Sequence, residues 1–339
     1  MIDGYIAYTR ARATQAAELA AAVDRLAGSV AELASGGRFA GPGPVFVGIG
    51  ASLAAACAPV WTLRSRGIHS WRLGAGDHPL PFPPSSHPMF GVSQSGRSAE
   101  TLAVLETIPF AKRFAVVNVV PSPIADLASA LVDLGNIEDS YASTIGFTAT
   151  VAALGLVADA WHGGRIDDGW SRIGDVVAMI DRDLGPQIRA LAPLFAAATS
   201  ADFVGAGPFV GSAEAAALLF REVARIPSTG MSTRQYLHGS MESAGGGVHV
   251  LFGGEREFAA AETLAGAGHP AILVTSEEFD TGLFDPRVHQ VRLPALPPAQ
   301  AAIAQIVVVQ VLVEAVAAVR DVVIEEFVFH NNDIKVPGL

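Results

Sequence analysis

Residues 91–101 read GVSQSGRSAET, a run of small hydroxyl residues and glycines between an apolar segment and a helical pattern. A strand that turns at glycines into a helix start presents unpaired N–H groups and the positive end of the helix dipole, which attract anions. Ser93, Ser95 and Ser98 can add hydroxyl donors, and Gln94 can donate through its side-chain amide. Three hydroxyls around one helix start suit a phosphate monoester. The alternative is that these serines only cap the helix and fill the turn.

A second glycine turn, GIGAS at residues 48–52, follows another apolar segment. Its Ser52 could supply a further phosphate donor from the neighbouring strand. The same turn could instead bind a dinucleotide, but that fingerprint requires G-x-G-x-x-G and an acid about twenty residues later. Because the third glycine is missing, we expect phosphate binding and no cofactor, with an NAD-dependent oxidoreductase as the weaker alternative.

Both turns belong to a pattern that the chain repeats. The segment VFVGIGASLAAACAPVWTL is echoed downstream by DFVGAGPFVGSAEAAALLF, and aligning Phe46 with Phe203 places Gly48 on Gly205. Strands that alternate with helices predict parallel sheets covered on both faces. We therefore predict an α/β fold of two doubly wound parallel-sheet lobes that arose by internal duplication.

Five parts are expected along the chain. They are an N-terminal helical arm with an amphipathic helix near 9–34 (residues 1–40), a first lobe with the expected phosphate-binding turns (41–165), a helical linker (166–199), a second lobe (200–329), and a C-terminal tail that is expected to fold over the binding site (330–339).

Composition limits the partners and the compartment. The 339 residues carry a net charge of −11, which argues against nucleic acid or an anionic membrane as a general partner. The single cysteine, Cys57, excludes an internal disulfide and a cysteine-based zinc site. No signal peptide is evident at the N-terminus, and the most apolar later stretch, Ile303 to Val319, contains polar residues typical of a buried core helix. We expect a cytoplasmic protein.

The motifs together resemble those of the sugar isomerase (SIS) family. GVSQSGRSAET is similar to the family's phosphosugar motif, IEDSYASTIGFT at 137–148 resembles its E-x-x-x-A-S-T-K-x-F-T segment, and QYLHG at 235–239 resembles E-L-K-H-G. The resemblance extends from about residue 40 to the end, and it includes the isomerase domain of glucosamine-6-phosphate synthase, sugar-phosphate deaminases and fructosamine-phosphate deglycases. It implies flavodoxin-like lobes and an enzyme that moves a proton between C1 and C2 of a sugar-6-phosphate or amino-sugar-6-phosphate. No glutaminase domain is expected ahead of these motifs.

The resemblance also implies catalytic roles. Glu222 matches the base that moves the proton, and His238 matches the histidine that opens the sugar ring. In relatives this histidine comes from the partner subunit, so a homodimer with shared active sites is expected. Lys335, one of only two lysines beside twenty arginines, matches the tail lysine. A primary amine can form a Schiff base, which a guanidinium cannot. The phosphosugar-binding group is then expected to comprise Ser52, Ser93, Gln94, Ser95, Ser98 and Glu138, the acid before the A-S-T segment.

The chemistry of the residues is compatible with these roles but does not require them. Returning a proton to a carbon beside a carbonyl suits a partly buried carboxylate with a raised pKa. On sequence alone, however, a surface carboxylate paired with Arg221 or Arg225 is the favoured reading of Glu222, because most helical glutamates are solvated, and only the resemblance favours the catalytic role. The histidines show no metal-binding spacing, so no metal is expected. His249 and His330 are expected to be structural, with a place in the lining of the site as the alternative.

Several positions depart from the family pattern. Ile145, Gln235, Leu237 and Leu219 stand where relatives have charged residues, and Arg97 replaces an acid within the serine-rich turn. These departures indicate a sugar other than fructose-6-phosphate, or a different reaction. A non-catalytic sugar-phosphate sensor is the alternative function.

Overall fold

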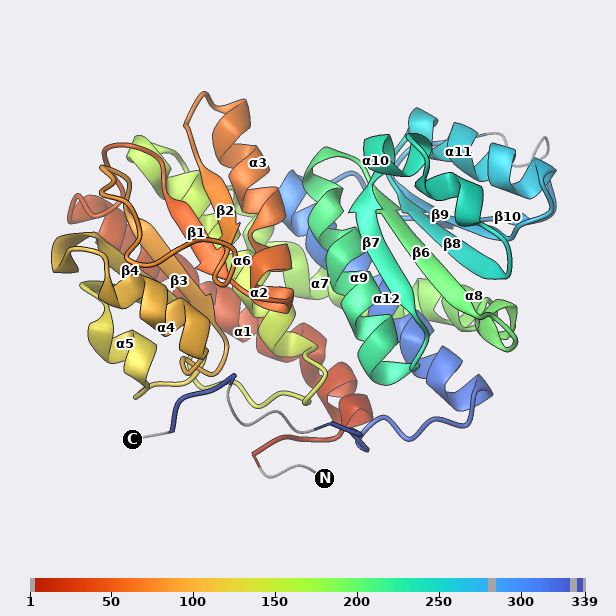
Figure 1. Ribbon diagram of the computed structural model, residues 1–339, viewed down its shortest axis with the longest axis horizontal. Helices are drawn as coiled ribbons and strands as arrows, with labels where there is room; N and C mark the ends of the chain where they lie inside the picture. The colour runs from red at the N-terminus through yellow and green to blue at the C-terminus, as the bar shows by residue number, and fades with distance from the viewer. Residues whose placement is uncertain (1–3, 280–284, 330–333, 338–339) are drawn as a thin grey trace. The chain divides into compact units, whose positions relative to one another are not determined.

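The computed structural model describes residues 4–279, 285–329 and 334–337 and divides into two compact units. Met1–Gly174 and Phe327–Leu339 form the first unit, and Asp175–Glu326 forms the second. Each contains a five-stranded, wholly parallel sheet with helices packed on it (Figure 1). The predicted fold, two doubly wound α/β lobes in tandem, is confirmed.

The first sheet has the strand order β2-β1-β3-β4-β5. Its strands are β1 (Val45–Gly48), β2 (Trp71–Gly74), β3 (Met89–Ser93), β4 (Arg113–Val117) and β5 (Ala130–Asp133). The helices of this unit are α1 (Tyr8–Ser35), α2 (Ala51–Ala55), α3 (Cys57–Ser65), α4 (Ala99–Glu106), α5 (Pro123–Leu127) and α6 (Ile145–Ala160), with short 3-10 turns at Phe110–Lys112, Trp161–Gly163 and Asp168–Arg172.

The second sheet has the order β10-β9-β8-β6-β7. Its strands are β6 (Ser200–Gly205), β7 (Ser228–Ser232), β8 (Gly247–Phe252), β9 (Ala271–Thr275) and β10 (Val288–Arg292). The longer helices are α9 (Val210–Val223), α11 (Glu255–Gly266) and α12 (Pro298–Val319), and the shorter helical elements are α7 (Ile173–Met179), a π-helical turn (Ile180–Leu184), α8 (Gly185–Arg189), α10 (Thr233–Leu237) and 3-10 turns at Ala192–Phe195, Gly207–Phe209 and Ser240–Ser243. If β6 is matched with β1 and the later strands in turn, the two orders are identical, as the predicted repeat requires.

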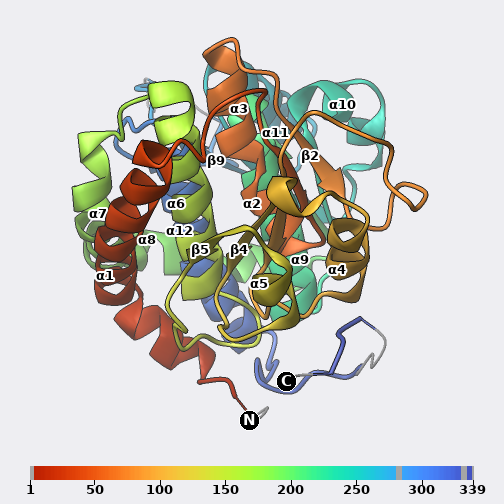
Figure 2. The same cartoon turned by 90° about the vertical axis from the view of Figure 1, so that its left-hand side faces the viewer.

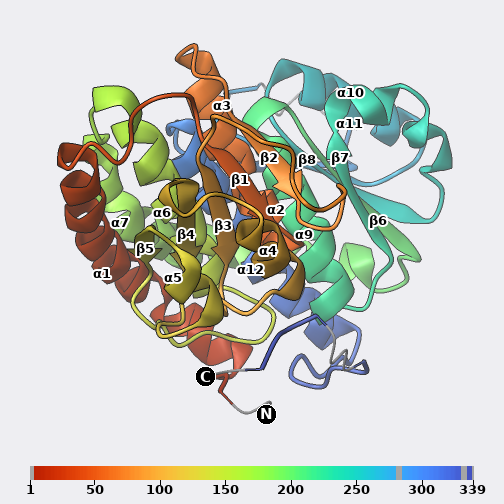
Figure 3. The same ribbon diagram turned by 60° about the vertical axis from the view of Figure 1, so that its left-hand side comes forward.

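Alternation along the strands divides the core of the first unit into two layers. Val45 and Val47 point to the face that α4 and α5 cover, where they pack with Val104 and Ile124. Phe46 points to the opposite face. There its ring packs on that of Phe90 from β3, which in turn contacts Trp161. The predicted N-terminal helix, observed as α1, packs along α6 (Figures 2 and 3).

The second unit is built in the same way. One face of its sheet packs on α11 through residues such as Val204 and Leu264, and the other packs on α9, where Phe203 meets Phe220. Helix α12 packs on α9, and most of its residues are buried. By length and composition, Pro298–Val319 and Ile145–Gly163 could each span a membrane, but both are largely buried inside the protein.

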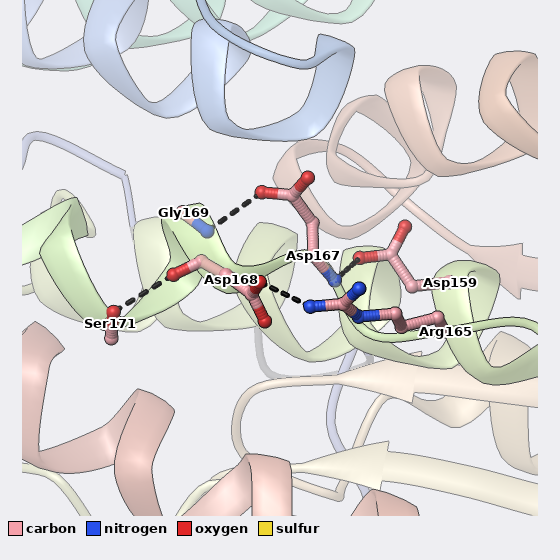
Figure 4. A network of polar contacts seen from close by, with 6 residues as sticks. All are labelled: Asp159, Arg165, Asp167, Asp168, Gly169 and Ser171. Carbon is pink, nitrogen blue, oxygen red and sulfur yellow. Dashed lines mark hydrogen bonds and ion pairs between the residues drawn. The ribbon is translucent and has the colours of Figure 1, made fainter.

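A polar network around Asp159 fixes the chain after α6 (Figure 4). Asp159 Oδ2 accepts hydrogen bonds from the backbone N–H of Asp167 at 3.2 Å and from the indole N–H of Trp170 at 2.8 Å. Asp167 in turn accepts from the backbone N–H of Gly169 at 2.8 Å. Burial raises the pKa of the Asp159 carboxyl. The network holds the last turns of the first unit ahead of its boundary at Gly174.

Strand order also determines where each unit can bind a ligand. In the first sheet β1 lies between β2 and β3, so the chain leaves β1 toward one side and returns on the other. Ligands of open α/β sheets bind at such a switch point, outside the carboxyl ends of the strands. The turns after β1 and β3 carry the serines of the sequence prediction. In the second unit the equivalent turns follow β6 and β8.

Candidate functional site

The serine loop, Ser93–Ser98, leaves the carboxyl end of β3 and ends where α4 begins. Ser93 is only 1% exposed, and its hydroxyl lies 2.9 Å from that of Ser98. Gly96 adopts a φ of 63°, in the left-handed region, and a Cβ at this position would collide with Ser122. The loop therefore turns tightly enough to bring both hydroxyls to the start of α4, where backbone N–H groups lack helical partners.

Two further hydroxyls remain available, one within the loop and one beside it. Ser95 and Ser52, which lies in α2 just after β1, are part-exposed. Within the ranges described, neither hydroxyl has a hydrogen-bond partner. Because β1 and β3 are paired neighbours, Ser52 follows the strand beside that of the serine loop. The first unit thus offers donors on both sides of its switch point.

The Gln94 side chain is hydrogen-bonded to a buried carboxylate that the sequence did not point to. Its Nε2 donates to Asp139 Oδ2 at 3.0 Å, and Asp139 is only 4% exposed. The same carboxylate accepts from the backbone N–H groups of Thr144, Ile145 and Gly146 at 2.9–3.2 Å. The hydroxyls of Ser143 and Thr144 also donate to it. Asp139 therefore caps α6 and at the same time fixes the Gln94 side chain.

Glu138, the acid that the resemblance places in the binding group, lies at the surface instead of beside Gln94. Its side chain is 73% exposed and lies 3.5 Å from the guanidinium of Arg10 on α1. Its role in binding stays a prediction. A run of polar residues ahead of the apolar helix α6 was the available signal for Asp139, but the sequence alone does not tell which acid of the Glu-Asp pair turns inward.

The end of the chain reaches the serine loop. Lys335 pairs with Ser98 in an isolated antiparallel bridge, and the backbone N–H of Ala99 donates to the Ile334 carbonyl at 3.2 Å. The Lys335 ammonium is exposed and lies 3.5 Å from the Tyr5 hydroxyl. The predicted amine and the predicted phosphate-binding hydroxyls therefore share one region of the first unit. His330 lies outside the described residues.

Glu222 belongs to the second unit, near the end of α9. Its carboxyl is partly buried, and desolvation raises its pKa to about 7. The neighbouring arginines do not neutralise it: Arg221 donates from Nε to the Ser228 carbonyl at 2.7 Å, and Arg225 donates to the Glu326 carbonyl. Across the described chain, no ion pair or hydrogen bond engages this carboxylate. The alternative of a surface ion pair with Arg221 or Arg225 is therefore wrong.

His238 follows the last residue of α10 and is exposed. Two residues earlier, Tyr236 is fully buried, and its hydroxyl lies 2.9 Å from Nδ1 of His249. That nitrogen is also 3.3 Å from Asp202 Oδ2, while Nε2 faces the Ala244 carbonyl at 3.2 Å. A carbonyl only accepts, so Nε2 carries a proton. His249 thus joins two strands to α10, which is the structural role expected of it.

Comparisons with known proteins find similarity in the fold but not in the sequence. No protein-family model matches the sequence, and no curated protein matches it significantly. Among solved structures, the C-terminal domain of glucosamine-fructose-6-phosphate aminotransferase from Francisella tularensis matches with a TM-score of 0.79 at 18% identity, over 99% of this chain and 100% of that one. Tagatose-6-phosphate ketose/aldose isomerase from Escherichia coli matches with a TM-score of 0.74 at 14% identity, over 96% of both chains.

This chain shares the fold of these two proteins. Glucosamine-6-phosphate deaminase from Thermotoga maritima shares the fold as well, with a TM-score of 0.70 at 18% identity over 90% of this chain and 94% of that one. The fold that the sequence motifs implied, tandem SIS lobes, is therefore confirmed, although the identities are too low to transfer an activity. In the residue ranges that the structure describes, no three His, Cys, Asp or Glu side chains form a metal-binding group.

Proposed function

We propose that this chain is a phosphosugar isomerase that moves a proton between C1 and C2 of a sugar-6-phosphate or amino-sugar-6-phosphate, with deamination or deglycation as variants of the same chemistry. The observation that carries the proposal is Glu222: a partly buried carboxylate with a pKa near 7 and no neutralising partner. A general base works best when its pKa lies near the operating pH, because it must both take and return the proton. The fold, which this chain shares with phosphosugar isomerases, supports a role of Glu222 as the base.

In this mechanism the serine loop binds the phosphate. Ser52, Ser93, Gln94, Ser95 and Ser98 donate hydrogen bonds to its oxygens, and the start of α4 adds backbone N–H groups. Since the net charge of the protein is negative, attraction of an anion depends on these local donors and on Arg97 and Lys335. Binding through the phosphate leaves the other end of the sugar free to react.

The reaction then needs three further groups. His238 passes a proton between the ring oxygen and the anomeric hydroxyl and so opens the ring. Glu222 removes the proton from the carbon beside the carbonyl, which leaves an enediolate and a protonated Glu222 carboxyl, and the carboxyl then returns the proton to the neighbouring carbon. Lys335 stabilises the negative oxygen of that intermediate, or forms a Schiff base with the carbonyl. The protein acts in the cytoplasm as a homodimer in which His238 serves the partner's site.

A ligand panel tests the proposal. Phosphorylated sugars, amino sugars and fructosamines are screened for an increase in melting temperature, because a ligand that binds only the folded state stabilises it. Each stabilising ligand is then incubated with the wild type and with Glu222→Gln. We expect at least one to be converted by the wild type alone. Stabilisation without conversion of any ligand would instead identify the sensor.

Hybrid dimers test the role of His238. Glu222→Gln and His238→Ala subunits are each expected to be inactive by themselves, and after subunit exchange some hybrid sites should contain both wild-type groups. Recovery of activity is expected. Absence of recovery despite demonstrated exchange would place both residues of one site in a single chain.

A further inference from the structure

Arg97 connects the serine loop to the end of the chain by two separate hydrogen bonds. The backbone N–H of Val336 donates to the Arg97 carbonyl at 2.9 Å, and Arg97 Nε donates back to the Val336 carbonyl at 2.7 Å. With the bond from Ala99 to Ile334 on the other side, these contacts bracket Lys335 and hold it opposite Ser98. The register of the tail on the loop is therefore set at the residues that flank the lysine.

The contact depends on the chemistry of arginine. A terminal segment stays ordered only where it is bonded to the body of the protein, and the described tail residues, 334–337, belong to no helix or extended strand. An acid at position 97, as in the related motif, has no proton to donate to the Val336 carbonyl when ionised. A lysine carries the charge but lacks the planar, directed N–H groups of the guanidinium.

We propose that Arg97 is a positioning residue that fixes Lys335 against the serine loop and thereby couples occupancy of the loop to placement of the amine. The assignment of a role to the amine rests on the proposed function, whereas the coupling of loop and tail does not. Because Arg97 lies within the loop, a change in loop conformation on binding of an anion is transmitted directly to Val336. Reciprocity then requires that docking of the tail strengthens binding of the anion.

Amide hydrogen exchange of the full-length protein tests the coupling without any assay of turnover. The reporters are the N–H groups of Val336 and Ala99, which donate across the contact. Arg97→Gln is expected to accelerate exchange at Val336 at least tenfold and to accelerate exchange at Ala99 as well. Arg64→Gln is the matched control, because Arg64 Nε donates to the Ser70 carbonyl at 2.8 Å in the same unit without touching the tail. The control should leave both reporters within twofold of the wild type.

Inorganic phosphate serves as the loop ligand. At saturation it should slow exchange at Val336 at least threefold in the wild type and have no such effect in Arg97→Gln. Unchanged exchange at Val336 in Arg97→Gln, or a wild-type tail that does not respond to bound phosphate, would overturn the proposal.

Arg97→Lys keeps the positive charge but removes the guanidinium that bonds Val336, so it separates the placement of the tail from the charge at position 97. It also serves as the test if Arg97→Gln fails to fold. It is expected to accelerate Val336 exchange, to lower kcat for the substrate at least tenfold and to leave KM within threefold. Unchanged exchange at Val336 together with unchanged kcat and KM would show that the positive charge alone is sufficient at this position, and would overturn the positioning role. If no substrate is turned over by the wild type, the proposed function fails and the exchange experiments still decide the coupling.

Discussion

The turn after β3 in the first unit and the turn after β8 in the second follow equivalent strands at the switch points of two sheets with the same order. Five residues, Gln94–Ser98, separate β3 from α4, whereas only Gly253 and Gly254 separate β8 from α11. The longer turn contributes hydroxyls. The shorter turn contributes no hydroxyl. At the start of its helix, a side chain of the protein itself accepts a backbone N–H group.

That side chain is Glu257, which is 2% exposed. Its Oε2 accepts the backbone N–H of Gly254 at 3.0 Å, and its carboxylate closely approaches Gly253. A carboxylate thus occupies the position where an incoming anion would find donors in the first unit. The two equivalent turns therefore differ in what meets the helix start: in the first unit it is a loop with several hydroxyls, and in the second unit it is a carboxylate of the protein that accepts the Gly254 N–H.

The largest expected effect concerns Glu222, the proposed proton-transfer group of the second unit. Glu222→Gln should lower kcat by about 10²–10⁴-fold, the range for a positioned general acid or base, while affinity for the sugar phosphate stays within a few-fold. Steady-state kinetics and a thermal-shift titration measure the two quantities. Near wild-type turnover would show that the base is another residue.

Next in size is the carboxylate that supports Gln94. Asp139→Asn places an amide NH₂ among several donors and leaves some of them unpaired, which should cost about 3 kcal/mol of folding free energy. Urea denaturation checks this value. Glu138→Gln is the matched control, since Glu138 is exposed, and it should change stability by less than about 0.5 kcal/mol. Equal effects of the two substitutions would contradict the division of roles between these neighbours.

The raised pKa of Glu222 makes stability depend on pH. Below pH 4.5 the carboxyl is protonated in both the folded and the unfolded state. Between 4.5 and about 7 the unfolded carboxyl ionises first, so the folded state loses stability relative to Glu222→Gln. The loss reaches at most about 3 kcal/mol above pH 7, at 1.36 kcal/mol per pKa unit. Urea midpoints of both proteins across this window should diverge; a constant difference would place the pKa near its ordinary value.

The hydroxyls of the first unit should affect binding more than chemistry. Ser93→Ala and Ser95→Ala should each raise KM by the loss of a hydrogen bond to a charged group, about 1.5–3 kcal/mol, with smaller changes in kcat. Kinetics with the phosphorylated sugar and binding of its unphosphorylated form separate the effects, because only the former should respond. If neither substitution changes KM, the anion binds elsewhere.

The smallest effect is expected at the closed turn of the second unit. Glu257→Gln keeps an oxygen that can accept the Gly254 N–H, so stability should change by less than about 1 kcal/mol, the usual value of a charge at a helix start. KM for the sugar phosphate should stay within twofold. A large rise in KM would show that this turn also contacts the substrate.

Much of the architecture could be predicted because its signals are local. Apolar strand segments, glycine turns and a repeated pattern are properties of short stretches, and they indicated both parallel sheets. The serine loop could also be recognised, because hydroxyls at the start of a helix indicate anion binding whatever the position of the preceding strand in the sheet.

Contacts between distant segments could not be predicted in the same way. Asp139 fixes Gln94 across 45 positions, and Arg97 meets Val336 across 239. Nothing local distinguishes Asp139 from Glu138, because the choice depends on which side chain the fold turns toward the N-terminus of α6. The pKa of Glu222 likewise depends on burial, and on Arg221 and Arg225 being engaged by backbone carbonyls.

Solvent exchange at the substrate carbon tests the central claim most directly. A sugar-6-phosphate that stabilises the protein is incubated in deuterium oxide with the wild type, Glu222→Gln or Ser95→Ala, and deuterium at C1 and C2 is followed by NMR. We expect deuterium in the sugar with the wild type, none above background with Glu222→Gln, and slower incorporation with Ser95→Ala that recovers at higher substrate concentration. Incorporation by Glu222→Gln at the wild-type rate, or no incorporation by the wild type from any ligand that it binds, would contradict the central claim.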